Sequence, residues 1–236
     1  MSVNSNDPNV VLLEIVATHL GDDLLEQMIF VGGAVAGLLI TDPAMPAIRP
    51  TEDVDLVVQA SVLREYHAVE KALTARGFVH DLSAGAPICR WRIAKVVVDV
   101  MPMEKAVLGF ANRWYPMAIS TALAFTLPSQ KMIKLIAAQV FIATKLEAFA
   151  DRGNGDFLFS YDLGDIIAVV DGRDGLLDEC KLQAPELIEY LQEKFAALLA
   201  NPAFMQALSG HLSPDSASQA RLPLLENKLR ALTNLA

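Results

Sequence analysis

The chain has 236 residues, of which 53% are hydrophobic and 20% charged, and its formal net charge is −9. These values are typical of a chain with a substantial hydrophobic core and exclude intrinsic disorder. An acidic chain is not expected to hold nucleic acid through an overall basic surface, but a local basic groove is compatible with the total.

Cysteine content and the apolar segments limit the class of protein further. The two cysteines, Cys89 and Cys180, are too few for a disulfide framework and lack the CxxC spacing of zinc and redox sites. The first residues, MSVNSNDPN, lack the basic and apolar regions of a secretory signal. The longest apolar stretch, residues 28–40, is shorter than the roughly 18 residues that suggest a membrane span. We therefore expect a soluble, cytoplasmic protein with no membrane partner.

The beginning of the chain shows helix and strand patterns in alternation. A helix is expected over residues 10–20, ending at Gly21. An apolar strand then ends in Gly32 and Gly33 and leads into a second helix. After a proline-rich loop, residues 51–58 show the period-two alternation of a strand.

The remaining segments divide the chain into a mixed part and a helical part. We expect a helix over residues 63–76 and a hairpin formed by the segments ICRWRI and KVVVDVMP. From residue 129 the strand signals stop, and helices are expected over residues 131–152, 162–172, 185–200 and 224–235. The sequence thus predicts an α+β fold, with a mixed β-sheet and flanking helices over residues 1–125 and a helical domain over residues 126–236.

Charge is distributed unevenly along the chain. Residues 82–155 hold nine Lys or Arg and four Asp or Glu, a balance of +5, whereas the remainder carries −14. The middle of the chain is therefore suited to facing an anion.

Glycines and aspartates in the first part indicate phosphate and metal chemistry. Backbone N–H groups at Gly32 and Gly33, together with a helix N-terminus, favour phosphate, although a tight turn with close packing also explains the two glycines. Asp53 and Asp55, one residue apart on a strand, point to the same side, where two carboxylates repel each other unless a cation lies between them. Mg²⁺ prefers such oxygens.

A third carboxylate, Asp99, lies in the apolar segment VVVDV, where an isolated charge would be costly to bury. The alternatives are a solvated strand edge for Asp53 and Asp55 and an exposed strand face for Asp99. Shared metal coordination requires the three carboxylates to lie within about 8 Å of one another.

The order of these features resembles that in polymerase-beta-type nucleotidyltransferases, and within that superfamily the AbiEii/AbiGii toxin-type enzymes, relatives of the MenT toxins. The resemblance rests on VGGAVAGLL, RPTEDVDL and VDVMP and continues in LGFANRWY and in residues 143–173. It covers roughly residues 28–175. It implies a nucleotidyltransferase fold whose helical domain completes the active-site cleft. The usual Gly-Ser is Gly-Gly here, which removes one hydroxyl contact to phosphate and leaves the backbone contacts.

The resemblance also implies roles for particular residues. Asp53, Asp55 and Asp99 would hold two Mg²⁺ or Mn²⁺ ions, and Asp99 would help to take the proton from the attacking hydroxyl. Lys145 would take part in catalysis by reaching the nucleotide phosphates, with an exposed lysine paired to an acid as the alternative. The nucleotide-binding residues implied in this way are Gly32, Gly33, Arg49, Thr51, Lys145, Asp162 and Asp165.

Several of these residues have a second interpretation. Arg49 contacts phosphate or stabilises its loop, and Asp162 and Asp165 lie near the nucleotide or cap a helix and orient Lys145 or Arg152. The segment from Asn112 to Tyr115 grips a phosphate and stacks a base, or its aromatic residues are buried by packing between the two halves of the chain. The four histidines form no zinc pattern and are expected to be structural or surface residues: His19, His67, His80 and His211.

The sequence therefore predicts a metal-dependent enzyme that transfers a nucleoside monophosphate from an NTP to an acceptor hydroxyl and releases pyrophosphate. Toxin-type relatives act on RNA, including tRNA 3′ ends, and the basic middle segment suits an RNA backbone. The alternatives are transfer to a small molecule such as an aminoglycoside, and a catalytically silent nucleotide- or partner-binding module. The resemblance also implies a toxin–antitoxin system, with a cognate antitoxin protein as a candidate partner.

Overall fold

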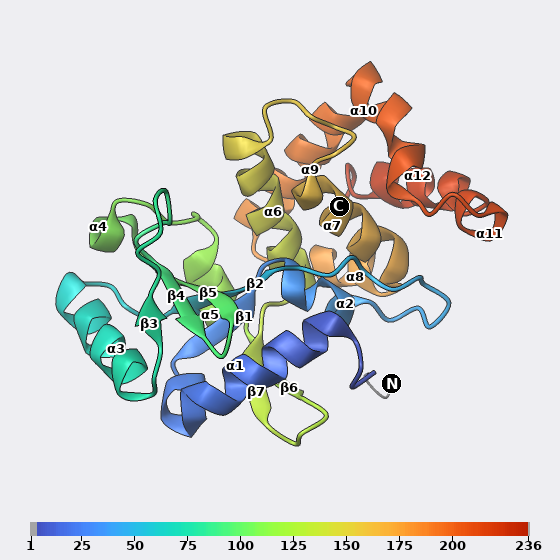
Figure 1. Ribbon diagram of the computed structural model, residues 1–236. Helices are drawn as coiled ribbons and strands as arrows, with labels where there is room; N and C mark the ends of the chain where they lie inside the picture. Colours follow the sequence, from blue (N-terminus) through green and yellow to red (C-terminus); the bar gives the residue numbers. More distant parts are fainter. Residues whose placement is uncertain (1–3, 236) are drawn as a thin grey trace. The chain divides into compact units, whose positions relative to one another are not determined.

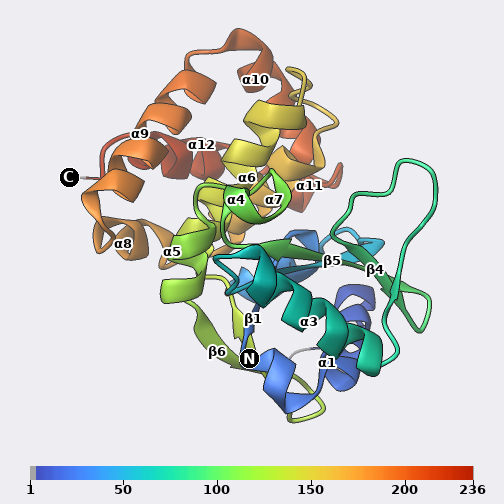
Figure 2. The same ribbon diagram turned by 90° about the vertical axis from the view of Figure 1, so that its left-hand side faces the viewer.

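The computed structural model describes residues 4–235, and the chain divides into two compact units. The first unit comprises residues 4–35 and 49–137, and the second comprises residues 36–48 and 138–235. Figures 1 and 2 show the ribbon in two views at right angles. The domain boundary expected at residue 125 stays a prediction, and the strands of the sheet continue beyond it.

A seven-stranded mixed sheet forms the centre of the first unit, in the order β3-β4-β5-β2-β1-β7-β6. The middle strand, β2, pairs in parallel with β5 and antiparallel with β1, and β1 pairs in parallel with β7. The strands are β1 (Met28–Val31), β2 (Asp53–Val58), β3 (Val79–His80), β4 (Arg90–Ile93), β5 (Val96–Pro102), β6 (Leu123–Thr126) and β7 (Met132–Leu135).

Helices flank this sheet in the first unit. The longest, α1, packs against β1, β2, β5 and β7. Its backbone leaves helical geometry at Gly21, where φ is 67°, which confirms the expected break, although the helix resumes to Leu25. The helices of the unit are α1 (Pro8–Leu25), η1 (Gly33–Val35), α3 (Leu63–Ala75), α4 (Lys105–Leu108) and α5 (Tyr115–Ser120).

The hairpin expected from two adjacent strand patterns is formed by β4 and β5. Its loop has two residues, Ala94 and Lys95, with φ values of 46° and 73°. Positive φ at both positions matches the right-handed twist of the flanking strands, so a two-residue loop closes the hairpin without splaying it. The tight loop sets the register, which places Arg90 opposite Asp99.

The second unit is helical. Helices α6 and α7 pack together, and α12 contacts α7 and α9. The segment 36–48 joins this unit because the backbone N–H groups of Thr41 and Asp42 donate to the carbonyl oxygen of Gly172, both at 2.9 Å. The helices are α2 (Ala36–Leu39), α6 (Ala138–Arg152), α7 (Tyr161–Gly172), α8 (Leu176–Lys181), α9 (Pro185–Leu199), α10 (Pro202–Ala207), η2 (Leu208–His211), α11 (Ser216–Gln219) and α12 (Leu222–Ala231).

The predicted fold class, a mixed β-sheet with flanking helices followed by a helical part, is confirmed. The expectation of one helix from residue 131 is wrong at its start, because β7 occupies Met132–Leu135 and α6 begins only at Ala138. Burial alternates along β7, with Ile133 and Leu135 buried and their neighbours exposed. This is strand periodicity, and the N–H of Ile136 continues the pairing by donating to the carbonyl oxygen of Phe30 at 3.1 Å.

The structure also bears on the cysteines and on the apolar segments of the chain. Cys89 and Cys180 are buried and form no disulfide, and burial raises the pKa of each thiol to about 12, so neither is a reactive thiolate at neutral pH. Across residues 4–235, none of the helices combines the length and hydropathy that a membrane crossing needs.

Candidate functional site

Three aspartates of the first unit lie together at the middle of the sheet. Asp53 and Asp55 alternate with buried Val54 along β2, and Asp99 lies on β5 in register with Asp55. Because β2 and β5 are adjacent parallel strands, all three carboxylates point to one side of the sheet. One oxygen from each carboxylate lies within 4.8 Å of the others, well inside the separation that shared metal coordination requires. We call Asp53, Asp55 and Asp99 the carboxylate cluster.

Arg90 joins the carboxylate cluster from the neighbouring strand, β4. Its Nε donates to Asp99 Oδ1 at 2.8 Å and its Nη2 donates to Asp99 Oδ2 at 2.6 Å, a bidentate pair of high geometric specificity. Its Nη2 also lies 3.8 Å from Asp53 Oδ2. The hydrogen bonds and charge of Asp99 raise the pKa of the Arg90 guanidinium above its usual value, and the charge of this arginine is permanent.

The turn after β1 lies directly against the carboxylate cluster. Gly32 has φ of +71°, and a Cβ atom built on it would lie 1.8 Å from Asp55 Oδ2. Only a residue without a side chain fits between the backbone and this carboxylate. Gly33, the second glycine of the predicted turn, is buried at the start of η1. Gly32 of the glycine pair therefore lies directly against the carboxylate cluster.

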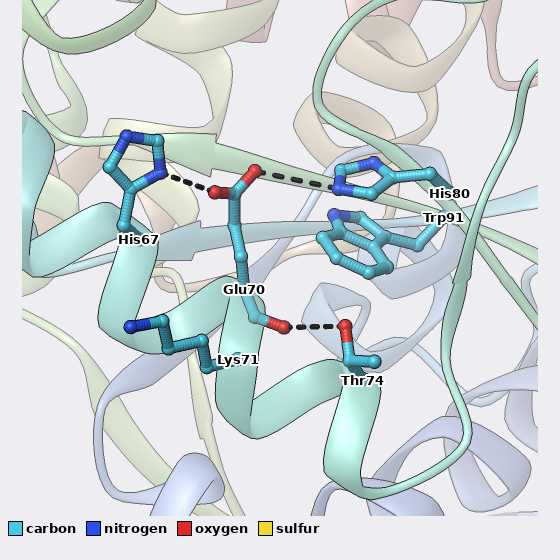
Figure 3. Close-up of a pocket in the computed structure, with 6 residues that line it drawn as sticks. All are labelled: His67, Glu70, Lys71, Thr74, His80 and Trp91. Atoms are coloured by element: carbon cyan, nitrogen blue, oxygen red, sulfur yellow. Dashed lines mark hydrogen bonds and ion pairs between the residues drawn. The ribbon is translucent and has the colours of Figure 1, made fainter.

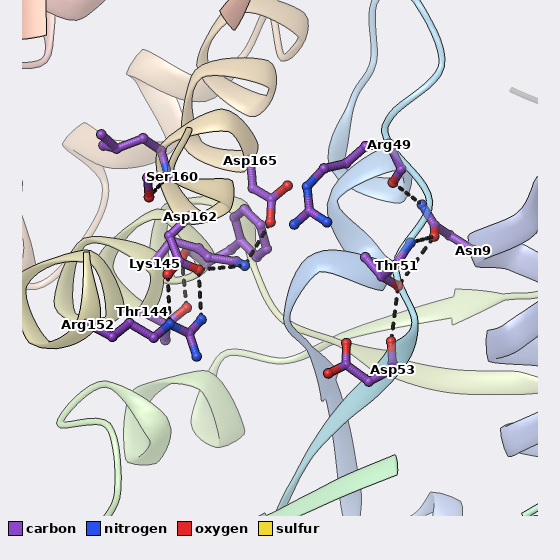
Figure 4. A network of polar contacts seen from close by, with 12 residues as sticks. Asn9, Arg49, Thr51, Asp53, Thr144, Lys145, Arg152, Ser160, Asp162 and Asp165 are labelled. Atoms are coloured by element: carbon purple, nitrogen blue, oxygen red, sulfur yellow. Dashed lines mark hydrogen bonds and ion pairs between the residues drawn. The ribbon is translucent and has the colours of Figure 1, made fainter. Parts of the chain in front are cut away.

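The loop before β2 is braced by Asn9 of α1, which sequence reasoning did not identify. Asn9 Nδ2 donates to the carbonyl oxygen of Arg49 at 3.1 Å, and Asn9 Oδ1 accepts from the N–H of Thr51 at 2.8 Å. The Thr51 hydroxyl donates to the carbonyl oxygen of Asp53 at 3.0 Å, as Figure 4 shows. These contacts fix the entry into β2, while nucleotide binding by Arg49 and Thr51 stays a prediction.

A second ionic cluster lies in the helical unit (Figure 4). Lys145 of α6 is 7% exposed, and its Nζ lies 3.0 Å from Asp162 Oδ1 and 2.7 Å from Asp165 Oδ2. Arg152 pairs with Asp162 through Nε and Nη2, both at 2.9 Å. Three residues apart on α7, the two aspartates share a face, as the spacing predicts. Lys145 is thus a buried lysine held between two acids rather than an exposed one.

Opposing effects act on the pKa of Asp162. Burial disfavours the charged carboxylate, but the hydrogen bonds and charges of Arg152 and Lys145 outweigh it, so the pKa of Asp162 lies below its usual value. The carboxylate is therefore ionised at neutral pH and pairs with both cations.

The aromatic residues of the Asn112–Tyr115 segment are buried. Trp114 is 2% exposed and Tyr115 is 9% exposed. The Tyr115 hydroxyl donates to the sulfur of Met101 at 3.0 Å, and the Arg113 guanidinium lies 4.8 Å from the centre of the Trp114 ring. This burial favours the packing interpretation of the segment over base stacking.

A surface hollow of about 310 Å³ lies between α3 and the β3–β4 strands (Figure 3). Glu70 links its two histidines, lying 2.6 Å from His67 Nδ1 and 3.5 Å from His80 Nε2, and His80 stacks on Trp91. Glu70 lies between the two imidazoles, so these residues do not converge on one point as the side chains of the carboxylate cluster do. His67 and His80 thus take part in surface polar contacts and stacking.

The carboxylate cluster fits a divalent metal ion. Its donors are hard oxygens on adjacent strands, and the formal charges of the three aspartates and Arg90 sum to −2. Mg²⁺ and Mn²⁺ prefer such oxygens and keep further positions for water and phosphate. In the described part of the chain, this is the group of acidic, histidine or cysteine side chains that converges closely enough to hold an ion.

We compared the chain with family models, curated proteins and solved structures. No family model matches the sequence, and no curated protein is detectably similar to it. Among solved structures, the chain is similar to the solution structure of the antibiotic-resistance factor ANT(2'')-Ia, with 12% sequence identity and a TM-score of 0.47. The match covers 81% of this chain and 92% of that chain.

Proposed function

We propose that this protein is a metal-dependent nucleotidyltransferase that transfers a nucleoside monophosphate from an NTP to an acceptor hydroxyl. The observation that carries the proposal is the carboxylate cluster, whose oxygens converge within 4.8 Å on the middle of the sheet. The glycine turn against Asp55 supports it, because such a turn offers backbone N–H groups to phosphate beside the metal ligands. The order of these features along the chain also supports it, because it resembles the order in the AbiEii/AbiGii toxin-type enzymes.

In this proposal Asp53, Asp55 and Asp99 would hold Mg²⁺ or Mn²⁺, and an ion bound there would supply Lewis-acid activation of the attacking hydroxyl and charge stabilisation of the leaving pyrophosphate. Asp99 accepts the hydroxyl proton. The hydroxyl oxygen forms a bond to the α-phosphorus, the bond from that phosphorus to the pyrophosphate oxygen breaks, and the proton passes to solvent. Arg90 holds Asp99 in the orientation that this transfer needs.

The nucleotide-binding assignments are part of the same proposal. Backbone N–H groups at Gly32 and Gly33 would contact the phosphates, together with Arg49 and Thr51 of the loop before β2. Lys145, Asp162 and Asp165 would contribute from the helical unit, as the resemblance implies. Because Lys145 pairs with both aspartates, their charges hold the ammonium group in one place.

For the acceptor we propose RNA, such as the 3′ end of a tRNA. The balance of +5 over residues 82–155 supports a polyanionic acceptor. A small cationic acceptor such as an aminoglycoside is the competing candidate, favoured by the overall charge of −9. A cognate antitoxin protein, implied by the toxin-type resemblance, belongs to the proposal as a regulator.

Labelled-nucleotide transfer tests the function. The protein is incubated with each labelled NTP, Mg²⁺ or Mn²⁺, and either total RNA or an aminoglycoside panel. Asp53→Asn is expected to lower transfer by about two to three orders of magnitude, because it removes a charged ligand at the reacting centre. The matched control is Glu52→Gln, which removes the same charge at the adjacent exposed position and is expected to leave transfer unchanged.

Each outcome identifies a different account of the protein. Label on RNA supports RNA as the acceptor. Label on an aminoglycoside, with none on RNA, shows instead that the acceptor is a small molecule. Transfer that survives Asp53→Asn contradicts the proposed metal site. Nucleotide binding with no transfer to any acceptor favours the catalytically silent module.

A further inference from the structure

Arg90 stands among the carboxylates that the proposed function assigns to the metal. Its guanidinium contacts both oxygens of Asp99, at 2.8 Å and 2.6 Å, and lies 3.8 Å from Asp53 Oδ2. Its side chain is 28% exposed and that of Asp99 is 11% exposed. The ion pair is therefore partly shielded from water, and the charge of Arg90 acts on Asp99 and Asp53 at short range.

The pairing leaves Asp99 able to bind a cation. Each carboxylate oxygen has two acceptor positions, and the guanidinium uses one on each oxygen of Asp99. The remaining positions stay open to a metal ion without breaking the ion pair. Arg90 and a bound divalent ion would thus share Asp99, and their like charges would oppose each other across the same carboxylate.

We propose that Arg90 is a positioning residue that orients Asp99 and, through its charge, weakens the binding of divalent cations to the nucleotide-free site. The inference rests on the proposed function in that the carboxylate cluster is the metal site. The formal charges of the three aspartates and Arg90 sum to −2, the charge that one divalent ion balances. Without Arg90 the cluster carries −3 and attracts such an ion more strongly.

The charge effect and the orienting effect can be separated by substitution. Arg90→Gln removes the charge and the bidentate contact, whereas Arg90→Lys keeps the charge and loses the planar fork. Removing a unit charge a few ångströms from a divalent ion is expected to tighten its binding by about tenfold. We therefore expect Arg90→Gln to bind Mn²⁺ about tenfold more tightly than the wild type and Arg90→Lys to bind it about as the wild type does.

Arg92 provides a matched control on the same strand. Two residues beyond Arg90, it pairs with Asp81 at 2.9 Å and is more exposed. Arg92→Gln removes the same charge from β4 and is expected to leave Mn²⁺ affinity within about twofold of the wild type, because salt screens exposed charges.

The experiment measures the dissociation constant of Mn²⁺ by electron paramagnetic resonance on the full chain without nucleotide, with folding checked by thermal unfolding. Should Arg90→Gln fail to fold, Arg90→Met removes the same charge, keeps an apolar stem and carries the same expectation. In transfer assays both Arg90→Gln and Arg90→Lys are expected to lower kcat more than they raise KM for the NTP, since both lose the bidentate hold on Asp99.

Two results overturn the inference in distinguishable ways. Unchanged or weaker Mn²⁺ binding by folded Arg90→Gln, with normal binding by the wild type, overturns the role of Arg90 and leaves the proposed function standing. A wild type that binds no Mn²⁺ overturns both, because the carboxylate cluster is then not a metal site.

Discussion

The carboxylate of Asp55 occupies the space that a side chain at position 32 would need. A Cβ atom on Gly32 would meet Asp55 Oδ2 at 1.8 Å and Asp55 Cγ at 2.6 Å. Backbone and carboxylate therefore fit together only because the turn residue is glycine. At the scale of single residues, the turn and the Asp55 carboxylate are two parts of one arrangement.

Gly32→Ala is accordingly expected to displace Asp55 from the carboxylate cluster. We expect Mn²⁺ affinity to fall by about tenfold or more, as when groups that orient metal ligands are removed. The positive φ of Gly32 adds a cost of about 1 kcal/mol in the free energy of unfolding, because alanine disfavours that conformation. Mn²⁺ titration and chemical unfolding measure the two effects separately.

Gly85→Ala is the control that separates the cost of a positive φ from the displacement of Asp55. Gly85 has φ of +84°, but no atom lies within 4 Å of a Cβ built on it. The variant should show the same loss of stability with wild-type Mn²⁺ affinity. Equal Mn²⁺ affinities for both variants and the wild type would contradict the role assigned to Gly32.

The aspartates of the candidate site were predictable from sequence, and their partner was not. Asp53 and Asp55 lie two residues apart on an alternating strand, and Asp99 is a lone charge in an apolar run, which are local signals. Arg90 contacts the aspartates only because strand pairing brings it beside Asp99, nine positions further along the chain. A two-residue loop at Ala94 and Lys95 is the signal that would have placed Arg90 opposite Asp99.

The second ionic cluster, in the helical unit, also depends on contacts between elements. Helices α6 and α7 bring Lys145 between Asp162 and Asp165, and Arg152 closes the cluster at the end of α6. The charges are mutually paired, which offsets the cost of burying them. The cluster therefore links the two helices electrostatically as well as holding Lys145 in place.

The low pKa of Asp162 makes this link dependent on pH. A group whose folded pKa lies below its unfolded value of about 3.9 stabilises the fold above that value, and the contribution is lost as pH falls through the folded pKa. Asp162→Asn is therefore expected to lower the free energy of unfolding by about 1–3 kcal/mol at pH 7 and by progressively less below about pH 4. Urea unfolding at a series of pH values measures the difference.

Asp151→Asn is the control for this series. Asp151 is an exposed acid near the end of α6, and its substitution should change stability by less than about 0.5 kcal/mol at every pH. If Asp162→Asn costs the same at pH 3 as at pH 7, the ionised carboxylate is not the source of the stability.

Long periodic segments were the most predictable elements, and short strands the least. The helix over residues 63–76 corresponds to α3, and the segment at residues 185–200 corresponds to α9. In contrast, β7 has only four residues, and its apolar positions also fit the start of the long helix that follows. Its pairing with β1, distant in sequence, determines that it is a strand.

For the molecule as a whole, the carboxylate cluster concentrates negative charge in a chain that is already acidic. The formal −2 of the three aspartates and Arg90 is part of the formal charge of −9 of the chain, and it places like charges close together. Such a cluster is expected to reduce stability in the absence of cations, and a ligand that binds only the folded state restores it. Stability and metal binding are then linked through the same three residues.

Asp55→Asn tests this linkage. Without divalent ions, the variant is expected to be more stable than the wild type by about 0.5–1 kcal/mol, because one of three crowded charges is removed at nearly constant shape. With Mg²⁺ at about 100 times its dissociation constant, the wild type is expected to gain about 2.7 kcal/mol and the variant to gain almost nothing. Calorimetry in EDTA, in Mg²⁺, and in KCl of matched ionic strength measures both effects. A gain that KCl reproduces would be charge screening rather than binding at the cluster, and would count against the metal site.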